Sequence, residues 1–332
     1  MARRKIREYD AKHLLQEYLP QYGSAIEWKG ILISPETDLA ALPQRYPWLL
    51  STPLVAKPDQ LFGKRGKLGL IAVNRNFDQI KEFIDTHRNK ETQIGKATGT
   101  ITHFLIEPFI PHEKEYYLSC TSEREGITIY FSTQGGIDVE ENWNKVHKYF
   151  IPTLAPLEES SIEKELLENI PLEQKKSIST FITAVFKFYT NLDFTYLELN
   201  PFTIDEKNQI HILDTVAQVD DCASFKHSQE WKNISFPKAF GQTSFPEEEF
   251  IESIDKESGA SLKLTILNPQ GRIWNILSGG GASIIYLDTI ANLGKQNEIA
   301  NYGEYSGNPT TEESYQYAKT ILDLMTRENH PQ

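Results

Sequence analysis

Three apolar runs of strand length follow one another in the first half of the chain, and this feature constrains the fold most. The runs cover residues 102–107, 115–120 and 126–132, with only turn-forming or charged residues between them. Their length and spacing predict a β-meander. Apolar stripes of period 3.6 lie on both sides of it, at residues 77–84 and 173–189, and predict amphipathic helices. We therefore expect an α/β or α+β protein.

Further short elements are expected on both sides of a domain boundary. Before it, helices are predicted at residues 10–19, 36–46 and 160–169. Strands are predicted at residues 30–34, 53–57, 70–74, 194–200 and 209–214. A length of 332 residues suggests two or three domains, and we place the boundary in the Pro- and Phe-rich stretch 235–246, which has little periodicity. Beyond it, strands are predicted at residues 262–267 and 272–277, a glycine turn at 279–282, and helices at 284–293 and 311–327. This order is typical of the beginning of an α/β unit.

Composition and charge narrow the function. The formal net charge of −12 creates an overall field that repels nucleic acid and anionic membranes, so a phosphate-rich ligand needs a local positive pocket. No apolar run approaches the ~18–20 residues of a membrane span, and the first residues fit neither a secretory signal nor a transit peptide. Cys120 and Cys222 are each isolated, which argues against a disulfide framework. A reducing, cytoplasmic setting is expected.

The segment from Lys57 to Gly69 carries four cations and three glycines between two predicted strands. Glycines let backbone N–H groups approach a ligand closely, and Lys or Arg side chains neutralise phosphate oxygens. The GxxxxGK[ST] spacing of a Walker A loop is absent. The segment is therefore either a phosphate-binding loop of another kind or a solvated hairpin tip.

A second candidate segment runs from Phe104 to His112, where an apolar strand ends in two prolines. Pro108 has no N–H. Its carbonyl and the Ile110 N–H could then meet the edge of an adenine, while Glu115 could accept bonds from ribose hydroxyls. A plain strand end is the alternative.

Oxygen ligands occur at the ends of two predicted strands. The period of two places Glu198 and Asn200 on one face of their strand, and Asp214 ends the neighbouring strand. A few hard oxygen ligands of this kind suit a Mg²⁺ ion that bridges nucleotide phosphates. Carboxylates at strand ends are also common as ordinary surface groups, so both interpretations stay open.

The stretch Gly279–Ser283 follows an apolar strand and precedes a predicted helix. A helix N-terminus offers free N–H groups and a positive dipole end to an anion. The spacing departs from GxGxxG, so a tight βα turn is an equal alternative. The histidines show no metal-binding spacing and no nucleophile elbow occurs, so no catalytic residue is predicted on this chain.

Six segments together resemble ATP-citrate lyase, and the similarity runs essentially from end to end. They cover residues 57–70, 104–112, 194–202, 258–274, 278–289 and 300–307. The opening MARRKIREYD is similar to the short, separate alpha chain of plants and related lineages. The resemblance, shared more distantly with the β subunit of succinyl-CoA synthetase, implies an ATP-grasp domain over residues 1–240. Residues 241–332 would form the first part of a Rossmann-like, citrate-binding domain of the CoA-ligase type.

The resemblance also implies roles for individual residues. The positions that correspond to the ATP site are Lys57, Arg65, Gly66, Pro108, Ile110, Glu115 and Asp214. Asp214 would lie at the ATP-bound metal, and Asn200 would join it as a Mg²⁺ ligand by similarity to ATP-grasp enzymes generally. Positions assigned to a second magnesium are Asp255, Ser258 and Ala260. Gly307 falls on a citrate position, and further citrate candidates are Gly280, Gly281 and Ser283.

The resemblance ends at residues 326–332, where the family continues into a strand and a glycine-rich loop. In the family this loop, with a downstream arginine, completes the citrate pocket, so the citrate domain is expected to be truncated here and its site incomplete. The phosphorylated histidine and the coenzyme A site belong, in the family, to another region or to a partner subunit. None of the eight histidines is therefore nominated for that role.

The resemblance implies a cytosolic subunit of ATP-citrate lyase. With its partner subunit it would use ATP, Mg²⁺ and CoA to cleave citrate to acetyl-CoA and oxaloacetate, through phosphohistidine, citryl-phosphate and citryl-CoA. Alone, the chain is expected to bind ATP but not to cleave citrate. One alternative is the β subunit of a succinyl-CoA or citryl-CoA synthetase. The other is a non-catalytic nucleotide- or citrate-binding subunit, or an inactive fragment.

Overall fold

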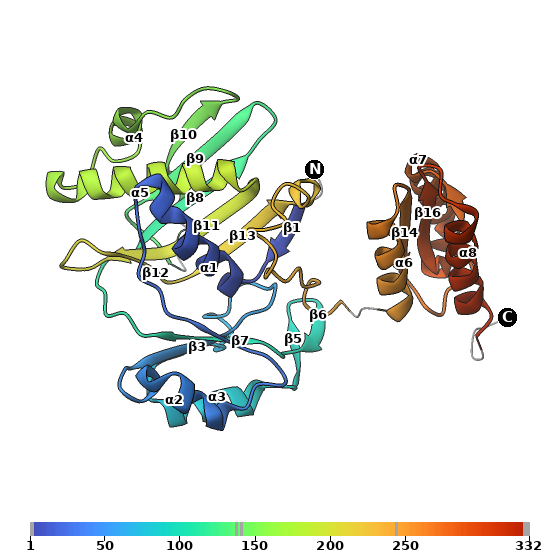
Figure 1. Ribbon diagram of the computed structural model, residues 1–332, viewed down its shortest axis with the longest axis horizontal. Helices are drawn as coiled ribbons and strands as arrows, with labels where there is room; N and C mark the ends of the chain where they lie inside the picture. Colours follow the sequence, from blue (N-terminus) through green and yellow to red (C-terminus); the bar gives the residue numbers. More distant parts are fainter. Residues whose placement is uncertain (1–2, 137–138, 140–141, 243–244, 328–332) are drawn as a thin grey trace. The chain divides into compact units, whose positions relative to one another are not determined.

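The computed structural model (Figure 1) describes residues 3–136, 139, 142–242 and 245–327. It contains two compact units, Met1–Gln242 and Thr243–Gln332, and each is described on its own. Both combine helices with sheets, so the predicted mixed α/β class is confirmed. No helix in the described part of the chain is long and apolar enough to cross a membrane. Parts of three predicted segments lie outside the described residues: 1–2, 243–244 and 328–332.

The larger sheet of the first unit is antiparallel, with the strand order β1-β13-β11-β8-β9-β10 and β12 paired to β11. Its strands are β1 (Arg3–Ile6), β8 (Tyr116–Ser122), β9 (Gly126–Ser132), β10 (His147–Pro152), β11 (Phe194–Ile204), β12 (Ile210–Ile212) and β13 (Thr215–Asp220). The predicted pairing of the strands near 194–200 and 209–214 is correct for β11 and β12. Asp214, predicted to end the second of these strands, lies between β12 and a further strand, β13, which was not predicted.

A meander is present, but the prediction that the run at 102–107 forms its first strand is wrong. Two of the three runs form β8 and β9, which pair with each other, and the third strand of the meander is β10. The run at 102–107 forms β7 (Phe104–Pro108) in a different sheet. Pro108 and Pro111 explain the difference, because a proline cannot donate to a strand ladder and the chain leaves the sheet there.

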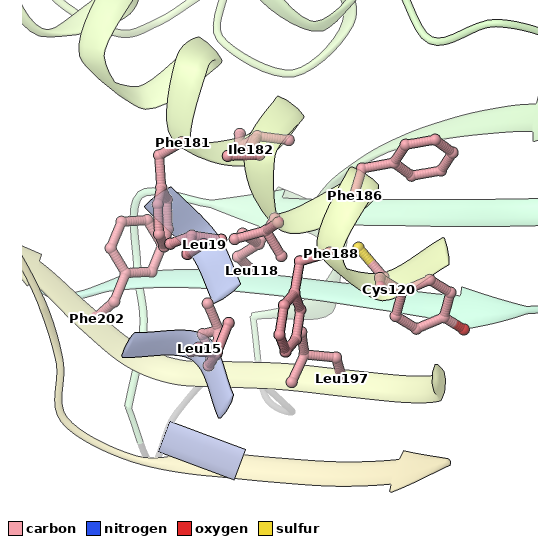
Figure 2. Close-up of a cluster of buried hydrophobic side chains, with 14 of the residues drawn as sticks. Leu15, Leu19, Leu118, Cys120, Phe181, Ile182, Phe186, Phe188, Leu197 and Phe202 are labelled. Carbon is pink, nitrogen blue, oxygen red and sulfur yellow. The ribbon is translucent and has the colours of Figure 1, made fainter. Parts of the chain in front are cut away.

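Helices cover one face of the larger sheet, and their apolar side chains pack with those of the sheet to form the main core of the first unit. They are α1 (Glu8–Tyr18), α4 (Glu159–Glu165) and α5 (Leu172–Asn191). The apolar stripe predicted for α5 is buried, and Figure 2 shows its Phe181, Ile182 and Phe188 packed with Leu118 and Leu197 of the sheet. The period of 3.6 was therefore a reliable guide to this face of the helix.

The second sheet of the first unit has the order β2-β7-β3-β4 and is antiparallel. It contains β2 (Ile31–Ile33), β3 (Leu54–Pro58), β7 and β4 (Ala72–Arg75), and a separate hairpin is formed by β5 (Glu91–Ile94) and β6 (Ala97–Thr100). Helix α3 (Phe77–His87) begins at the predicted residue because Asn76 and Gln79 form a capping box. The helix expected at 36–46 is only a 3₁₀ turn, Leu39–Ala41, and the four-residue α2 (Leu42–Arg45).

In its described residues, 245–327, the second unit combines a small three-stranded sheet with three α-helices. Its elements are α6 (Pro246–Glu257), β14 (Ser261–Ile266), β15 (Leu277–Ser278), α7 (Gly280–Ile290), β16 (Asn301–Ser306) and α8 (Thr311–Met325). Strand β16 pairs antiparallel with β14 and parallel with β15. The core is formed mainly by Ile251, Leu262, Leu264, Ile321 and Leu324.

Two predictions for this unit need correction. Helix α6 was not predicted, although it starts at the end of the aperiodic stretch with Pro246 and three glutamates, residues suited to a helix N-terminus. The strand expected at 272–277 is reduced to β15 and one isolated bridge at Ile273. Between them the buried Asn275 bonds to Asn301 through side-chain atoms, which replaces a regular ladder.

Truncation of Phe202 provides a test of the main core. Phe202 is fully buried, and its ring centroid lies 5.3 Å from that of Tyr116 and 5.4 Å from that of Phe181. We expect Phe202→Ala to lower the free energy of unfolding of the first unit by about 3–5 kcal/mol, because it leaves a cavity. Urea denaturation measures this. Phe225→Ala, at a side chain that is 84% exposed, is the control and is expected to stay within about 0.5 kcal/mol of wild type. If both substitutions lowered the free energy of unfolding equally, Phe202 would not belong to the main core.

Candidate functional site

A cleft of about 1580 Å³ in the first unit contains the predicted nucleotide residues. It is lined by β3 and the loop after it, by the end of β7 and the segment that follows, and by β11 and residues 211–216. The residues predicted from sequence for ATP and its metal all line this cleft: Lys57, Arg65, Gly66, Pro108, Ile110, Glu115, Asn200 and Asp214. Segments more than 150 residues apart in sequence are thus brought to one place.

Lys57 projects from β3 and is buried among acceptors. Its Nζ lies 2.5 Å from Glu8 Oε1, 2.6 Å from the Leu213 carbonyl and 3.1 Å from Glu107 Oε2. Burial lowers the pKa of Lys57, but the carboxylates of Glu107 and Glu8 more than offset this, and the pKa lies above its ordinary value. Lys57 is therefore a permanently charged group on the wall of the cleft.

Arg65 is held beside Lys57 by a second set of bonds. Its Nη1 donates to the Pro58 carbonyl at 2.8 Å, and its Nη2 lies 2.7 Å from Glu8 Oε2 and pairs with Asp214. Turns within the loop fold the chain back, because the N–H of Leu70 bonds to the carbonyl of Arg65 at 3.0 Å. The loop predicted as either a phosphate site or a hairpin tip thus presents a fixed guanidinium to the cleft.

Helix α1 is joined to this loop at its first turn. Asp59 accepts the N–H of Glu8 at 2.9 Å and that of Tyr9 at 3.1 Å, so its carboxylate caps the helix N-terminus. Lys12, one turn further, is also buried and lies 2.8 Å from both Glu8 and Glu107.

Glu8, Lys12 and Glu107 were missed by the sequence reasoning. A signal for two of them was present, since Glu8 and Lys12 are spaced i, i+4 and fall on the same helix face as the buried Ala11, Leu15 and Leu19. Charged residues on an apolar helix face are rarely buried without partners. Their spacing therefore indicated a buried polar contact of α1.

The residues predicted for the adenosine part lie together at the end of β7. The ring of His112 connects them, with Nδ1 2.7 Å from the Ile110 carbonyl and Nε2 3.1 Å from Glu115 Oε1. Pro108 is the last residue of β7 and is paired with Leu54. The segment 108–115 thus offers backbone groups and one carboxylate to the same cleft.

The predicted metal ligands of the cleft are close to existing bonds. Asn200 accepts the Gly136 N–H at 2.7 Å and donates to Glu198 Oε1 at 3.1 Å, while Asp214 pairs with Arg65 and accepts the Thr215 N–H. No cluster of three or more His, Cys, Asp or Glu side chains suited to a metal occurs among the described residues. The available oxygens fit Mg²⁺ that is also held by phosphate oxygens, since Mg²⁺ commonly takes one or two carboxylates plus substrate phosphates.

The residues predicted for a second magnesium gather at the start of β14 in the second unit. Asp255 accepts the Leu262 N–H at 2.7 Å and pairs with Lys263, and Ser258 accepts the Ala260 N–H at 2.9 Å. Gly307 lies next to them, because a Cβ built on it would be 3.1 Å from the Ala260 Cα. The oxygens of Asp255 are thus already used by the protein.

The other citrate candidates lie at the N-terminus of α7. Gly280 and Gly281 are its first two residues, and a Cβ on Gly280 would meet the Glu304 carboxylate at 2.8 Å. Ser283 is fully buried, and its hydroxyl lies 2.8 Å from the Gly303 carbonyl and 3.1 Å from that of Gly279. Its hydroxyl is therefore committed to joining α7 to β16.

Comparison with known proteins gives two adjacent family matches. Residues 2–231 match the ATP-citrate synthase ATP-grasp domain, and residues 242–332 match the ATP citrate lyase citrate-binding family. The chain is 47% identical to ATP-citrate synthase alpha chain protein 2 of Oryza sativa subsp. japonica, over 98% of this chain and 77% of the relative. It is also 47% identical to ATP-citrate synthase of Bos taurus, over its full length but only 30% of that relative.

A solved structure gives the same result in three dimensions. ATP citrate lyase from Methanothrix soehngenii, in complex with citrate and coenzyme A, superposes with a TM-score of 0.91 and 46% identity. The match covers 99% of this chain and 78% of that one. The resemblance expected from the six sequence segments is confirmed.

The pH dependence of stability tests the environment of the loop. The His103 carbonyl accepts the Asp59 N–H at 2.9 Å, and burial, with a smaller contribution from Arg7, lowers the pKa of His103 to about 4. In the unfolded chain the His103 side chain takes up a proton near pH 6.5, whereas in the folded protein it takes up the proton only near pH 4. The free energy of unfolding should therefore fall as the pH is lowered from 6.5 to 4. Denaturation of His103→Gln should show a shallower fall, and a slope equal to that of wild type contradicts this environment.

Proposed function

Since the chain belongs to the ATP-citrate synthase family, we propose that it is the ATP-binding subunit of an ATP-citrate lyase. The enzyme would cleave citrate to acetyl-CoA and oxaloacetate with ATP and CoA, and would release ADP and phosphate. The observation that carries the nucleotide part is the cleft, in which Lys57, Arg65 and Asp214 lie in one network of contacts. Lys57 and Arg65 on the cleft wall support phosphate binding, because a chain whose net charge is −12 needs local cationic donors to attract a phosphate.

In this proposal the chain neutralises the charge of the ATP phosphates and positions the nucleotide. Lys57, Arg65 and the backbone of Gly66 would hold the phosphates, and the backbone of Pro108 and Ile110 with Glu115 would hold the nucleoside. Asp214 and Asn200 would hold Mg²⁺, which supplies neutralisation of phosphate charge when bound. Phosphoryl transfer is dominated by such electrostatic stabilisation, so the chain needs no nucleophile of its own.

The later steps are proposed to need a partner. The rice relative is named an alpha chain, and the archaeal enzyme was solved with citrate and coenzyme A. We propose that a partner subunit carries the histidine that is phosphorylated, and that phosphate then passes to citrate to give citryl-phosphate and citryl-CoA. Coenzyme A would bind mainly to the partner, while Gly307 and Gly280 of the second unit would contribute to citrate binding, with Asp255, Ser258 and Ala260 at a second magnesium.

Calorimetric titration tests the nucleotide site. Asp214→Asn is expected to weaken the binding of ATP with Mg²⁺ at least about tenfold, or about 1.4 kcal/mol, because it removes a metal ligand and a partner of Arg65. Asp78→Asn, on the exposed face of α3, is the matched control and should bind as wild type does. If both variants bind ATP equally well, the nucleotide-site assignment is wrong.

Product analysis tests the reaction itself. The chain is mixed with its partner subunit, ATP, Mg²⁺, CoA and citrate, and the products are identified by mass spectrometry. Acetyl-CoA and oxaloacetate are expected, and neither should form when the chain is assayed alone. Citryl-CoA as the end product, or succinyl-CoA formed from succinate, would instead identify a synthetase subunit.

A further inference from the structure

Lys12 and Lys57 bind the same three acceptor groups. Lys12 Nζ lies 2.8 Å from Glu8 Oε1, 2.8 Å from Glu107 Oε1 and 2.9 Å from the Leu213 carbonyl. Lys57 Nζ lies 2.5 Å from the same Glu8 oxygen, 3.1 Å from the other oxygen of Glu107 and 2.6 Å from the same carbonyl. Each acceptor group is thus held twice.

The two lysines differ in their access to the cleft. Lys57 lines it, whereas Lys12 projects from α1 behind it and is fully buried. Two hydrogens of the Lys57 ammonium bond to Glu8 and to the Leu213 carbonyl, and the Glu107 carboxylate forms an ion pair with it at 3.1 Å. Because Lys57 is only 3% exposed and both hydrogen bonds hold Nζ against these acceptors, a phosphate can bind Nζ only if Lys57 turns away from them.

Releasing Lys57 would normally be costly. Glu8 and Glu107 are 4% and 7% exposed, and a buried carboxylate that loses its cation is strongly destabilised. Here each acceptor keeps a donor when Lys57 turns away. Lys12 still contacts all three groups, Arg65 contacts Glu8, and Trp28 donates to Glu107.

We propose that Lys12 is a positioning residue for nucleotide binding, which holds Glu8, Glu107 and the Leu213 carbonyl so that Lys57 is free to turn to a phosphate. The proposal rests on the proposed ATP site. It assigns to α1 a role in the binding step through a residue that does not reach the ligand. Without Lys12, the two carboxylates would retain Lys57 and compete with the phosphates for it.

The test compares ATP with adenosine, which has no phosphates. Lys12→Met is expected to weaken ATP binding in calorimetry at least tenfold, and to change the affinity for adenosine, followed by NMR titration, less than about twofold. The double variant K12M/E107Q removes the carboxylate that depends most on Lys12, and its ATP affinity should return to within about threefold of wild type. Lys12→Gln keeps a donor at the position and replaces K12M if that variant does not fold, as judged by thermal melting.

Lys5→Met is the matched control, because Lys5 is an exposed lysine on β1, shortly before α1, and its loss removes the same unit of charge. It should change ATP affinity less than about threefold. The inference is overturned if K12M binds ATP as wild type does, if it loses ATP and adenosine equally, if E107Q does not restore ATP binding, or if K5M weakens ATP binding as much as K12M. Failure of the wild type to bind ATP would instead refute the proposed function.

Discussion

The carboxylate of Glu8 is the contact on which the first unit's cleft depends. Its two oxygens accept bonds from Lys12 and Lys57 on one side and from Arg65 on the other. Burial alone would raise the pKa of Glu8, but these three cations hold the pKa well below its ordinary value, so the group stays ionised. One residue of the first helical turn thereby fixes a strand of the second sheet and the glycine-rich loop after it.

Such a network is better understood as a device for position than as a source of stability. Taking several charges out of water costs free energy that their mutual attraction often only just recovers, and a well-packed apolar cluster would often be as stable. The network holds three cations against three carboxylates: Lys12, Lys57 and Arg65 against Glu8, Glu107 and Asp214. Two of the cations reach the cleft wall in fixed positions, which an apolar cluster could not provide.

The sequence predicted those parts of the fold whose signal is local. The apolar stripe of α5 and the capping residues before α3 were sufficient for both helices. Strands β1 and β10 were missed because they lie at the two edges of their sheet. Three of the four residues of β1 are cations, and β10 shows no alternation of apolar and polar residues. Likewise, the Lys- and Gly-rich loop was visible as a motif, but its buried partners come from positions about 50 and 150 residues away, and no local pattern shows which distant groups will meet.

The two metal positions predicted from the sequence differ physically. In the cleft, the side chain of Asp214 is 30% exposed, and its contact with Arg65 can be exchanged for a cation because Arg65 keeps Glu8. In the second unit, the Asp255 side chain is only 15% exposed and holds both the start of β14 and Lys263. A cation there would have to displace Lys263 and compete with a backbone N–H. In the proposed function, a metal that arrives with the nucleotide would therefore meet less competition at Asp214 than at Asp255, which first has to give up a bond that organises its own strand.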